Sequence, residues 1–308
     1  MKNPNERILI SGATGLVGRA LCELLFKEGK KLVVLGRDKE SVFRKKFSIP
    51  CEYYRWRSPA DSKPPKEAFD VNAVIHLAGE PLAKKRWNDD LKKSFYASRV
   101  NSTKNLVAMM KESGCAAEVF LSASAIGIYE ESGEKNIHED FPKGKGFLSA
   151  LCRDWEFESK HSPCRSIQLR FGIILDDQQG ALREMIPVFK IGLGGVLGDG
   201  HQWMSWIHRQ DVVEIIYFLL KHKDFSGPVN VVAPNPVTNE EFTKKLASAL
   251  KVKAFLSVPK IVLKIAKGEM AEVILQSQKV SSSKIINLGY SFKYKNLEYA
   301  LEDLLAEN

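Results

Sequence analysis

Residues 7–18 read Arg-Ile-Leu-Ile-Ser-Gly-Ala-Thr-Gly-Leu-Val-Gly and decide the fold of this chain. The stretch opens with a short apolar run, and apolar side chains then recur at helical spacing from Leu16 to Leu25, until Gly29. A second apolar run covers residues 31–36. Strand, glycine turn, helix and strand within about thirty residues form the βαβ unit that a dinucleotide-binding fingerprint requires.

The glycines of this stretch have separate physical roles. Gly12 allows the tight turn out of the strand, Gly15 lets the backbone approach a pyrophosphate, and Gly18 lets the helix pack closely on the sheet. Unpaired N–H groups and the helix dipole at the helix start favour an anion. The cofactor contacts expected here are Gly12, Thr14, Gly15, Leu16, Val17 and Gly18. The spacing is G-x-x-G-x-x-G instead of G-x-G-x-x-G, so an ordinary strand-to-helix turn is the alternative.

The residue after the second apolar run distinguishes NAD from NADP. An acidic residue there would bind the ribose 2′-hydroxyl, whereas an arginine would pair with a 2′-phosphate. Arg37 occupies this position, and its planar fork of donors suits phosphate oxygens. NADP(H) is therefore the expected cofactor. Asp38 is the competing residue, because a small shift in register would bring its carboxylate to the ribose.

Further apolar runs, at residues 73–79, 118–124 and 165–170, alternate with helix-length amphipathic segments. Near-continuous apolar strands that alternate with helices indicate a parallel sheet covered on both faces. We therefore expect an α/β protein with a Rossmann doubly wound parallel sheet. Residues 1–240 would form the NADP-binding domain with a small substrate lobe, and residues 251–305 a C-terminal helical module.

Composition narrows the partners of this 308-residue chain, which carries a net charge of +9. The basic runs at residues 44–46, 84–86 and 92–93 are short and interrupted by acids, which favours a solvated face over nucleic-acid binding. A positive field also attracts a phosphate-rich dinucleotide. Five cysteines without metal-ligand spacing indicate reduced thiols and no metal site. With no export signal and no apolar run of about eighteen residues, we expect a cytoplasmic protein without a membrane partner.

A set of motifs that spans nearly the whole chain comprises residues 12–18, 77–81, 86–87, 98–100, 122–127, 148–156, 170–175, 203–211, 258–259 and 268–280. Together they resemble atypical extended short-chain dehydrogenase/reductases, specifically the YfcH-like epimerase family with its C-terminal domain of unknown function. The resemblance implies an NADP(H)-dependent oxidoreductase or epimerase that acts on a small polar substrate, with a sugar among the options. It also implies cofactor contacts at Leu77, Ala78, Gly79, Glu80, Arg99, Arg170 and Ile173.

The helix expected to carry the catalytic pair of this superfamily lacks it. Ordinary members use a serine to orient the substrate, a tyrosine as general acid/base and a lysine one helical turn later. Here one register places Leu148 and Cys152 at the tyrosine and lysine positions, and the other places Phe147 and Leu151 there. Neither register offers a phenol or an ammonium group.

The remaining candidates for catalysis are Ser122, Ser124, Tyr129 and Glu80. Both serines end a strand, and Tyr129 follows them, although a loop tyrosine packed on the surface is an equal alternative. Glu80 directly follows the run at residues 73–79, where it could hold a proton, cap the next segment or pair with Arg86. Arg99, in a helix expected over residues 91–111, reaches the cleft or is an exposed helical arginine.

Other patterns have structural interpretations. The spacing of Tyr217 and Lys221 matches the missing pair, but an amphipathic helix docked on the sheet explains it. His208 and Asp211 read as a histidine satisfied at a helix start. Residues 192–200 read as a flexible loop that closes over a ligand.

The tail is expected to contain four helices, over residues 256–267, 271–278, 282–287 and 296–305. It could cover the cleft or form a homodimer surface. Two function classes remain: an enzyme with an atypical active site, and an NADP(H)-binding sensor or interaction protein without turnover.

Overall fold

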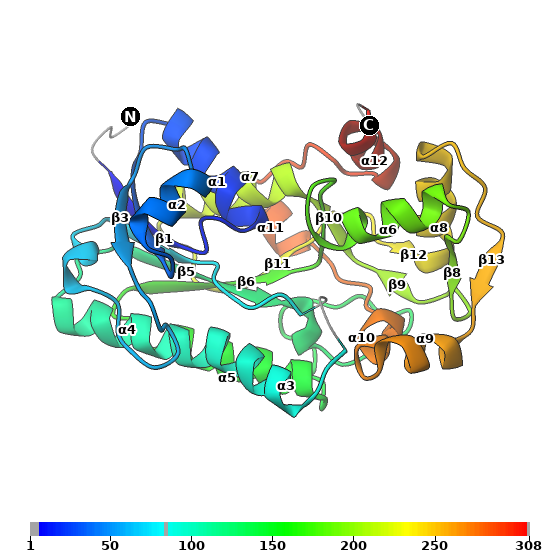
Figure 1. Ribbon diagram of the computed structural model, residues 1–308, viewed down its shortest axis with the longest axis horizontal. Helices are drawn as coiled ribbons and strands as arrows, with labels where there is room; N and C mark the ends of the chain where they lie inside the picture. The colour runs from blue at the N-terminus through cyan, green and yellow to red at the C-terminus, as the bar shows by residue number, and fades with distance from the viewer. Residues whose placement is uncertain (1–5, 83–85, 307–308) are drawn as a thin grey trace.

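The computed structural model describes residues 6–82 and 86–306. A seven-stranded sheet forms its centre, with all strands parallel and in the order β11-β6-β5-β4-β1-β2-β3 (Figure 1). The strands are β1 (Arg7–Ser11), β2 (Lys31–Gly36), β3 (Glu52–Arg55), β4 (Ala73–His76), β5 (Val119–Ala125), β6 (Arg165–Phe171) and β11 (Gly227–Val231). This is the doubly wound Rossmann sheet that the alternating apolar runs predict, so the expected fold class is confirmed. The expectation of no export signal depends in part on residues 1–4, and one of the basic runs includes Lys84 and Lys85. All of these residues lie outside the described part of the chain.

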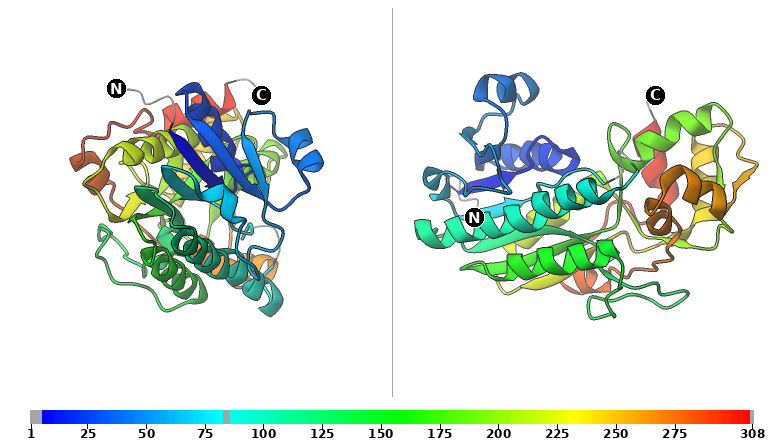
Figure 2. Two further views of the ribbon diagram at one scale, coloured as in Figure 1. Left: turned by 90° about the vertical axis from the view of Figure 1, so that its left-hand side faces the viewer. Right: turned by 60° about the horizontal axis from the view of Figure 1, so that its bottom comes forward.

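Helices cover both faces of the sheet, which explains why its strands are apolar throughout. Helices α1 (Leu16–Lys27) and α7 (Arg209–Lys221) contact each other on one face, and α4 (Ser102–Ser113) and α5 (Phe147–Lys160) contact each other on the opposite face (Figures 1 and 2). The helix α2 (Glu40–Lys46) lies beside β3, at the edge of the sheet. Buried leucines and isoleucines of α1 and α7 share one core with β1.

The helix expected over residues 91–111 is longer than predicted and contains an irregular turn. Asn88 caps α3 (Asp89–Tyr96) by accepting a hydrogen bond from the Leu91 amide. A π-turn, Ala97–Asn101, then joins α3 directly to α4. A π-turn inserts one extra residue into a helix, which changes the direction of the side chains around it.

A smaller lobe follows β6. Its elements are β7 (Ile173–Leu175), α6 (Gly180–Lys190), β8 (Gly195–Leu197), β9 (Trp203–Met204), β10 (Trp206–His208), β12 (Val237–Thr238), α8 (Asn239–Ala249), β13 (Leu256–Val258), α9 (Lys260–Lys267), α10 (Met270–Leu275) and α12 (Leu297–Leu305). The short helix α11 (Ser283–Asn287) instead packs against β11 of the central sheet. The flexible loop expected over residues 192–200 contains a short strand, because β8 pairs in parallel with β13 there. The helix expected from residue 256 begins only at Lys260, since residues 256–258 form that strand and Pro259 precedes the helix.

The C-terminal segment shares the cores of the rest of the chain. Ile285 and Phe292 belong to the same cluster as β1, and Leu297 and Leu301 pack in a second cluster with Trp206. Asp211, at the start of α7, accepts hydrogen bonds from the Tyr290 hydroxyl and from the amides of Lys293 and Tyr294. The tail is thus tied to both the central sheet and the lobe by buried apolar contacts, and to α7 by one carboxylate. Across residues 6–82 and 86–306, no helix is long and apolar enough to cross a bilayer.

Candidate functional site

The glycine turn between β1 and α1 is tightly packed against the end of β4. Gly12 has a φ of +80°, and a Cβ there would lie 2.7 Å from the carbonyl carbon of Leu77. A Cβ on Gly18 would lie 2.1 Å from the Gly12 carbonyl oxygen. Because the N-cap of α1 is Gly15, no side chain at that position covers the amides of the first turn. The turn therefore presents backbone N–H groups and the positive end of a helix dipole, which fit a pyrophosphate.

A buried histidine that no sequence motif indicates contacts Ser11, the residue just before this turn. His76 ends β4, pairs in register with Ser11 and is fully buried. Its Nδ1 lies 2.5 Å from the Ser11 hydroxyl, and its Nε2 lies 3.3 Å from the Ser102 hydroxyl. Burial lowers the pKa of His76 to about 4. A neutral imidazole thus links the ends of β1 and β4 to α4.

The corner beyond β2 carries the residues that would select the cofactor. The Arg37 side chain is 72% exposed, and its Nη1 lies 3.9 Å from Glu80 Oε2. The competing residue, Asp38, accepts a hydrogen bond from Lys46 Nζ at 3.0 Å. Arg55, at the end of β3, donates through Nε to the Arg37 carbonyl oxygen at 3.2 Å. The Arg55 guanidinium therefore contacts the backbone of Arg37, and only this tertiary contact brings Arg55 to the corner.

Arg99 reaches the end of β4 from the π-turn. Its Nη2 donates to the Glu80 carbonyl oxygen at 2.9 Å, and its Cζ lies 5.4 Å from the centre of the Trp155 ring. A Cβ on Gly79 would lie 3.1 Å from the same Cζ. Nη1 is buried and has no hydrogen-bond partner among the described residues. The alternative of an exposed helical arginine is wrong, because Nη1 is buried and Nη2 donates to a backbone carbonyl. This burial also lowers the pKa of Arg99.

The helix α5 places apolar groups where the superfamily carries its catalytic pair. Leu148 packs so closely that a Cβ on Gly127 would lie 2.5 Å from Leu148 Cδ2. Cys152 is 1% exposed, and burial raises the pKa of its thiol to about 12. At neutral pH this thiol is protonated and is neither a base nor a cation.

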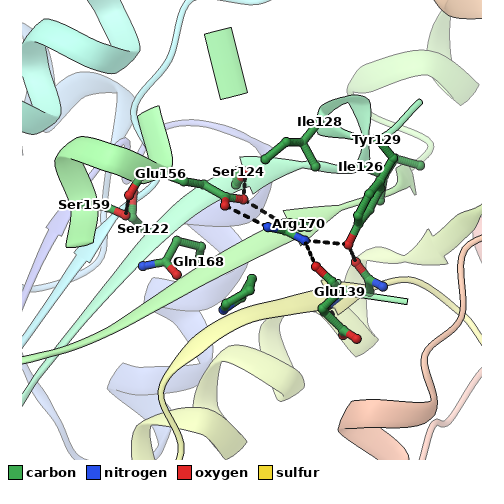
Figure 3. Close-up of polar contacts among 12 residues, drawn as sticks. Ser122, Ser124, Ile126, Ile128, Tyr129, Glu139, Glu156, Ser159, Gln168 and Arg170 are labelled. Carbon is green, nitrogen blue, oxygen red and sulfur yellow. Dashed lines mark hydrogen bonds and ion pairs between the residues drawn. The ribbon is translucent and has the colours of Figure 1, made fainter. Parts of the chain in front are cut away.

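The structure corrects the expectation that Arg170 contacts the cofactor. It lies inside β6 and is 2% exposed. Its Nε and Nη2 donate to the two carboxylate oxygens of Glu156 at 2.7 and 2.9 Å (Figure 3). Ser124 donates its hydroxyl to the same carboxylate at 2.8 Å. Arg170 and Glu156 thus form a buried bidentate ion pair, and Ser124 donates to the same carboxylate, so the serine and the arginine both have interior partners.

Tyr129 and Ser122 are also interior residues and not the acid/base and orienting groups expected. The Tyr129 hydroxyl donates to Asn230 Oδ1 at 2.6 Å and accepts from Arg170 Nη1 at 2.8 Å (Figure 3). Burial raises the pKa of Tyr129 well above its usual value. Ser122 is fully buried within β5, and its hydroxyl donates to the Ala123 carbonyl oxygen at 3.3 Å. Their placement results from long-range packing, which strand position alone does not reveal.

The other residues singled out in the lobe have structural surroundings. His208 caps α7 by accepting from the Gln210 amide, and burial lowers its pKa to about 4. The Tyr217 hydroxyl donates to Glu28, the residue that follows α1, and Lys221 lies over the Tyr217 ring. Ile173 begins β7, pairs with Trp206 and packs partly buried in the lobe core.

A cavity of about 490 Å³ opens beside the start of α5. Its walls come from residues after β5, from the start of α5 and from α9 and α10; they include Trp87, Gly127, Phe147, Leu148, Lys145, Lys264, Glu130, Glu131, Glu272 and Gln276. Trp87 and Phe147 meet edge to face, with ring centres 5.7 Å apart. An aromatic wall beside carboxylates, lysines and an amide suits a small polar molecule. The described residues contain no group of three or more His, Cys, Asp or Glu side chains placed to hold a metal.

Comparison with known proteins agrees with the resemblance seen in the sequence. Residues 8–146 match the NAD dependent epimerase/dehydratase family, and residues 258–304 match a domain of unknown function, DUF1731. The chain is 35% identical to the chloroplastic epimerase family protein SDR39U1 homolog of Arabidopsis thaliana, over 99% of this chain and 88% of that protein. It is 34% identical to the epimerase family protein YfhF of Bacillus subtilis, over 97% of this chain and 98% of that protein.

Solved structures show the same architecture. Human epimerase family protein SDR39U1, solved with NADPH, superposes with a TM-score of 0.88 at 29% identity, over 98% of this chain and 100% of that chain. The UDP-glucuronic acid 4-epimerase of Bacillus cereus shares the fold alone, with a TM-score of 0.77 at 17% identity, over 97% of this chain and 99% of that chain. From its sequence relatives and from the paired amino-terminal and DUF1731 matches, this chain belongs to the epimerase family of NAD dependent epimerase/dehydratase proteins.

Proposed function

We propose that this protein is an NADP(H)-dependent oxidoreductase or epimerase. Its substrate would be a small polar molecule, and sugars are one candidate class. One observation carries the proposal: the glycine turn and Arg37 lie along the same carboxyl edge of the sheet as the cavity beside α5. In open parallel sheets this edge binds ligands. That human SDR39U1 was solved with NADPH supports the choice of cofactor.

The residues that would hold NADP(H) come from consecutive turns at this edge. The α1 amides and the glycine turn would bind the pyrophosphate, and Arg37 with Arg55 would bind the 2′-phosphate. The remaining proposed contacts are Thr14, Leu16, Val17, Leu77, Ala78, Gly79, Glu80 and Arg99. Glu80 fits a cofactor role better than a catalytic one, because its carboxylate lies beside Arg37. When bound, the nicotinamide would supply or accept a hydride; the chain binds and orients the partners.

The proton that accompanies hydride transfer requires a group outside α5. Ser122, Ser124 and Tyr129 make interior hydrogen bonds, so an acid/base role would require them to leave buried positions. The cavity wall offers carboxylates instead, at Glu130, Glu131 and Glu272. We propose that one of these, or a water held by them, exchanges a proton with the substrate.

Calorimetric titration of the purified protein with NADPH and NADH tests the cofactor assignment. Single-turnover oxidation of bound NADPH across a panel of aldehydes, ketones and keto sugars then tests for chemistry. We expect NADPH to bind more tightly than NADH and at least one carbonyl to be reduced. If neither nucleotide binds, the proposal fails.

An NADP(H)-binding sensor or interaction protein is the second candidate. The observation that favours it is the absence of the acid/base pair from α5, where either Leu148 and Cys152 or Phe147 and Leu151 take its positions. Tight NADPH binding without turnover across the panel would support this candidate over the enzyme. We further propose a cytoplasmic location. A homodimer through α9 is also proposed, because Ile261 and Ile265 are each 69% exposed.

A further inference from the structure

We propose that Arg99 binds an oxygen of the nicotinamide half of NADP(H) and so supplies, from the π-turn, the active-site cation that α5 lacks. This inference rests on the proposed function, because it assigns a place in that same site. It concerns the half of the dinucleotide that Arg37 does not reach. Three independent features of the structure support it.

The first feature is an incompletely satisfied buried charge. Arg99 Nη2 donates to a backbone carbonyl, while Nη1 is buried without a hydrogen-bond partner among the described residues. The neighbouring Cys152 is a neutral thiol, and the Glu80 carboxylate lies beside Arg37. Within the described part of the chain, no carboxylate forms an ion pair with Arg99. Burying a guanidinium without a counter-charge is costly, so a ligand oxygen is the group that would complete this arrangement.

The second feature is the position of Arg99 along the sheet edge. Arg37 follows β2, and the glycine turn follows β1, which lies between β2 and β4. Arg99 reaches the residues after β4 from the side of α5, where it lies over Trp155. A dinucleotide with its 2′-phosphate at Arg37 and its pyrophosphate at α1 therefore extends toward Arg99 with its other half. The cavity wall formed by Leu148 begins one helical turn from Cys152.

The third feature is the way the π-turn fixes the guanidinium. Ser98 Oγ accepts from the Glu80 amide at 3.1 Å, while Arg99 donates to the Glu80 carbonyl, so the π-turn holds both backbone groups of one residue. Thr103 Oγ1 donates to the Arg99 carbonyl at 2.6 Å, and Ser102 Oγ donates to the Ser98 carbonyl at 2.6 Å. These hydroxyls satisfy backbone oxygens of the turn. Such helix irregularities are frequent at functional sites.

Replacement of Arg99 tests the assignment through binding, without any need for turnover. We compare wild-type protein with the variants Arg99→Met, Arg99→Lys, Arg37→Met and Arg165→Met. Arg165 is a matched control, because it is a partly buried arginine that donates to a backbone carbonyl, of Phe225, at the start of β6 and thus at the opposite edge of the sheet. The ligands are NADPH and adenosine 2′,5′-bisphosphate, which contains the adenosine half alone. Affinities come from calorimetry, and unfolding temperatures come from the same unliganded samples.

The expected result separates the two halves of the cofactor. Arg99→Met weakens NADPH binding about 10- to 100-fold, the effect of one hydrogen bond to a charged group, and changes the affinity for the bisphosphate less than about twofold. Arg37→Met weakens both ligands, and Arg165→Met weakens neither. Because the substitution removes a buried charge, unliganded Arg99→Met unfolds at or above the wild-type temperature. Arg99→Lys keeps the charge but has a single nitrogen, so it gives an intermediate loss for NADPH alone.

The opposing outcomes are equally distinct. If Arg99→Met binds NADPH within twofold of wild type, the assignment is overturned while the proposed function stands. Equal loss for both ligands also overturns it, since Arg99 would then act on the adenosine half or on the whole site. Should Arg99→Met fail to fold, Arg99→Lys is judged by the same ratio of affinities. Wild-type protein that binds no NADPH would instead refute the proposed function, and this assignment with it.

Discussion

Replacement of Glu156 by glutamine tests whether the buried hydrogen bonds among Glu156, Arg170 and Ser124 stabilise the fold. The Glu156 carboxylate is 2% exposed and accepts three hydrogen bonds, two from Arg170 and one from Ser124. Glutamine has nearly the same shape but no charge, and its amide nitrogen would meet a guanidinium N–H. The Arg170 cation would remain buried without its counter-charge. Breaking such a pair costs roughly 3 to 5 kcal/mol, a large share of the roughly 5 to 15 kcal/mol that stabilises a typical domain.

Urea unfolding followed by circular dichroism and tryptophan fluorescence measures this loss. The matched control is Glu112→Gln, because Glu112 pairs with Lys63 at the surface, where both side chains are about half exposed. That variant should change the unfolding free energy by less than about 1 kcal/mol. The double variant Glu156→Leu/Arg170→Met removes both charges and should lose at least about 2 kcal/mol less than the sum of its single variants. A loss below about 1 kcal/mol for Glu156→Gln, or additivity in the double variant, would refute the structural interpretation.

Three further predictions follow from the same geometry. Arg37→Asp should weaken NADPH binding by at least tenfold and leave NADH almost unchanged in calorimetry, because it removes the partner of the 2′-phosphate; equal loss for both nucleotides would contradict this role. Tyr129→Phe should cost about 1 to 3 kcal/mol in urea unfolding, because the buried Asn230 and Arg170 groups lose a partner, while the NADPH affinity stays at its wild-type value. The folded pKa of His76, about 4, lies below the ordinary value of 6.5, so the unfolded state binds the proton more readily. Its stabilising contribution is therefore complete above pH 6.5 and falls by up to about 3 kcal/mol as the pH drops toward 4. His76→Gln should be less stable than wild type at neutral pH, and the difference should shrink over that window; a constant difference would rule out this linkage.

The amino-terminal half of the fold could be predicted from the sequence because its signals are local. Apolar runs, helical spacing and the glycines of residues 12–18 act over a few residues, so they indicate βαβ order without knowledge of distant contacts. The position of Arg37 after β2 follows from the same local count. The boundaries of α9 and the pairing of β8 with β13 could not be predicted, because short strands form only where a distant partner is available.

For this protein, the sequence by itself determined the parallel α/β fold, the family, the glycine turn and the absence of the usual pair on α5. Only the tertiary structure decided which polar side chains are interior and which face the ligand edge. Tyr129, Ser124 and Arg170 are separated along the chain, yet in the core Arg170 donates to Tyr129 and shares the Glu156 carboxylate with Ser124, whereas Arg99 is left with a free donor. The physical reason is that hydrogen-bond partners and desolvation depend on atoms brought together by packing, and no local pattern records them.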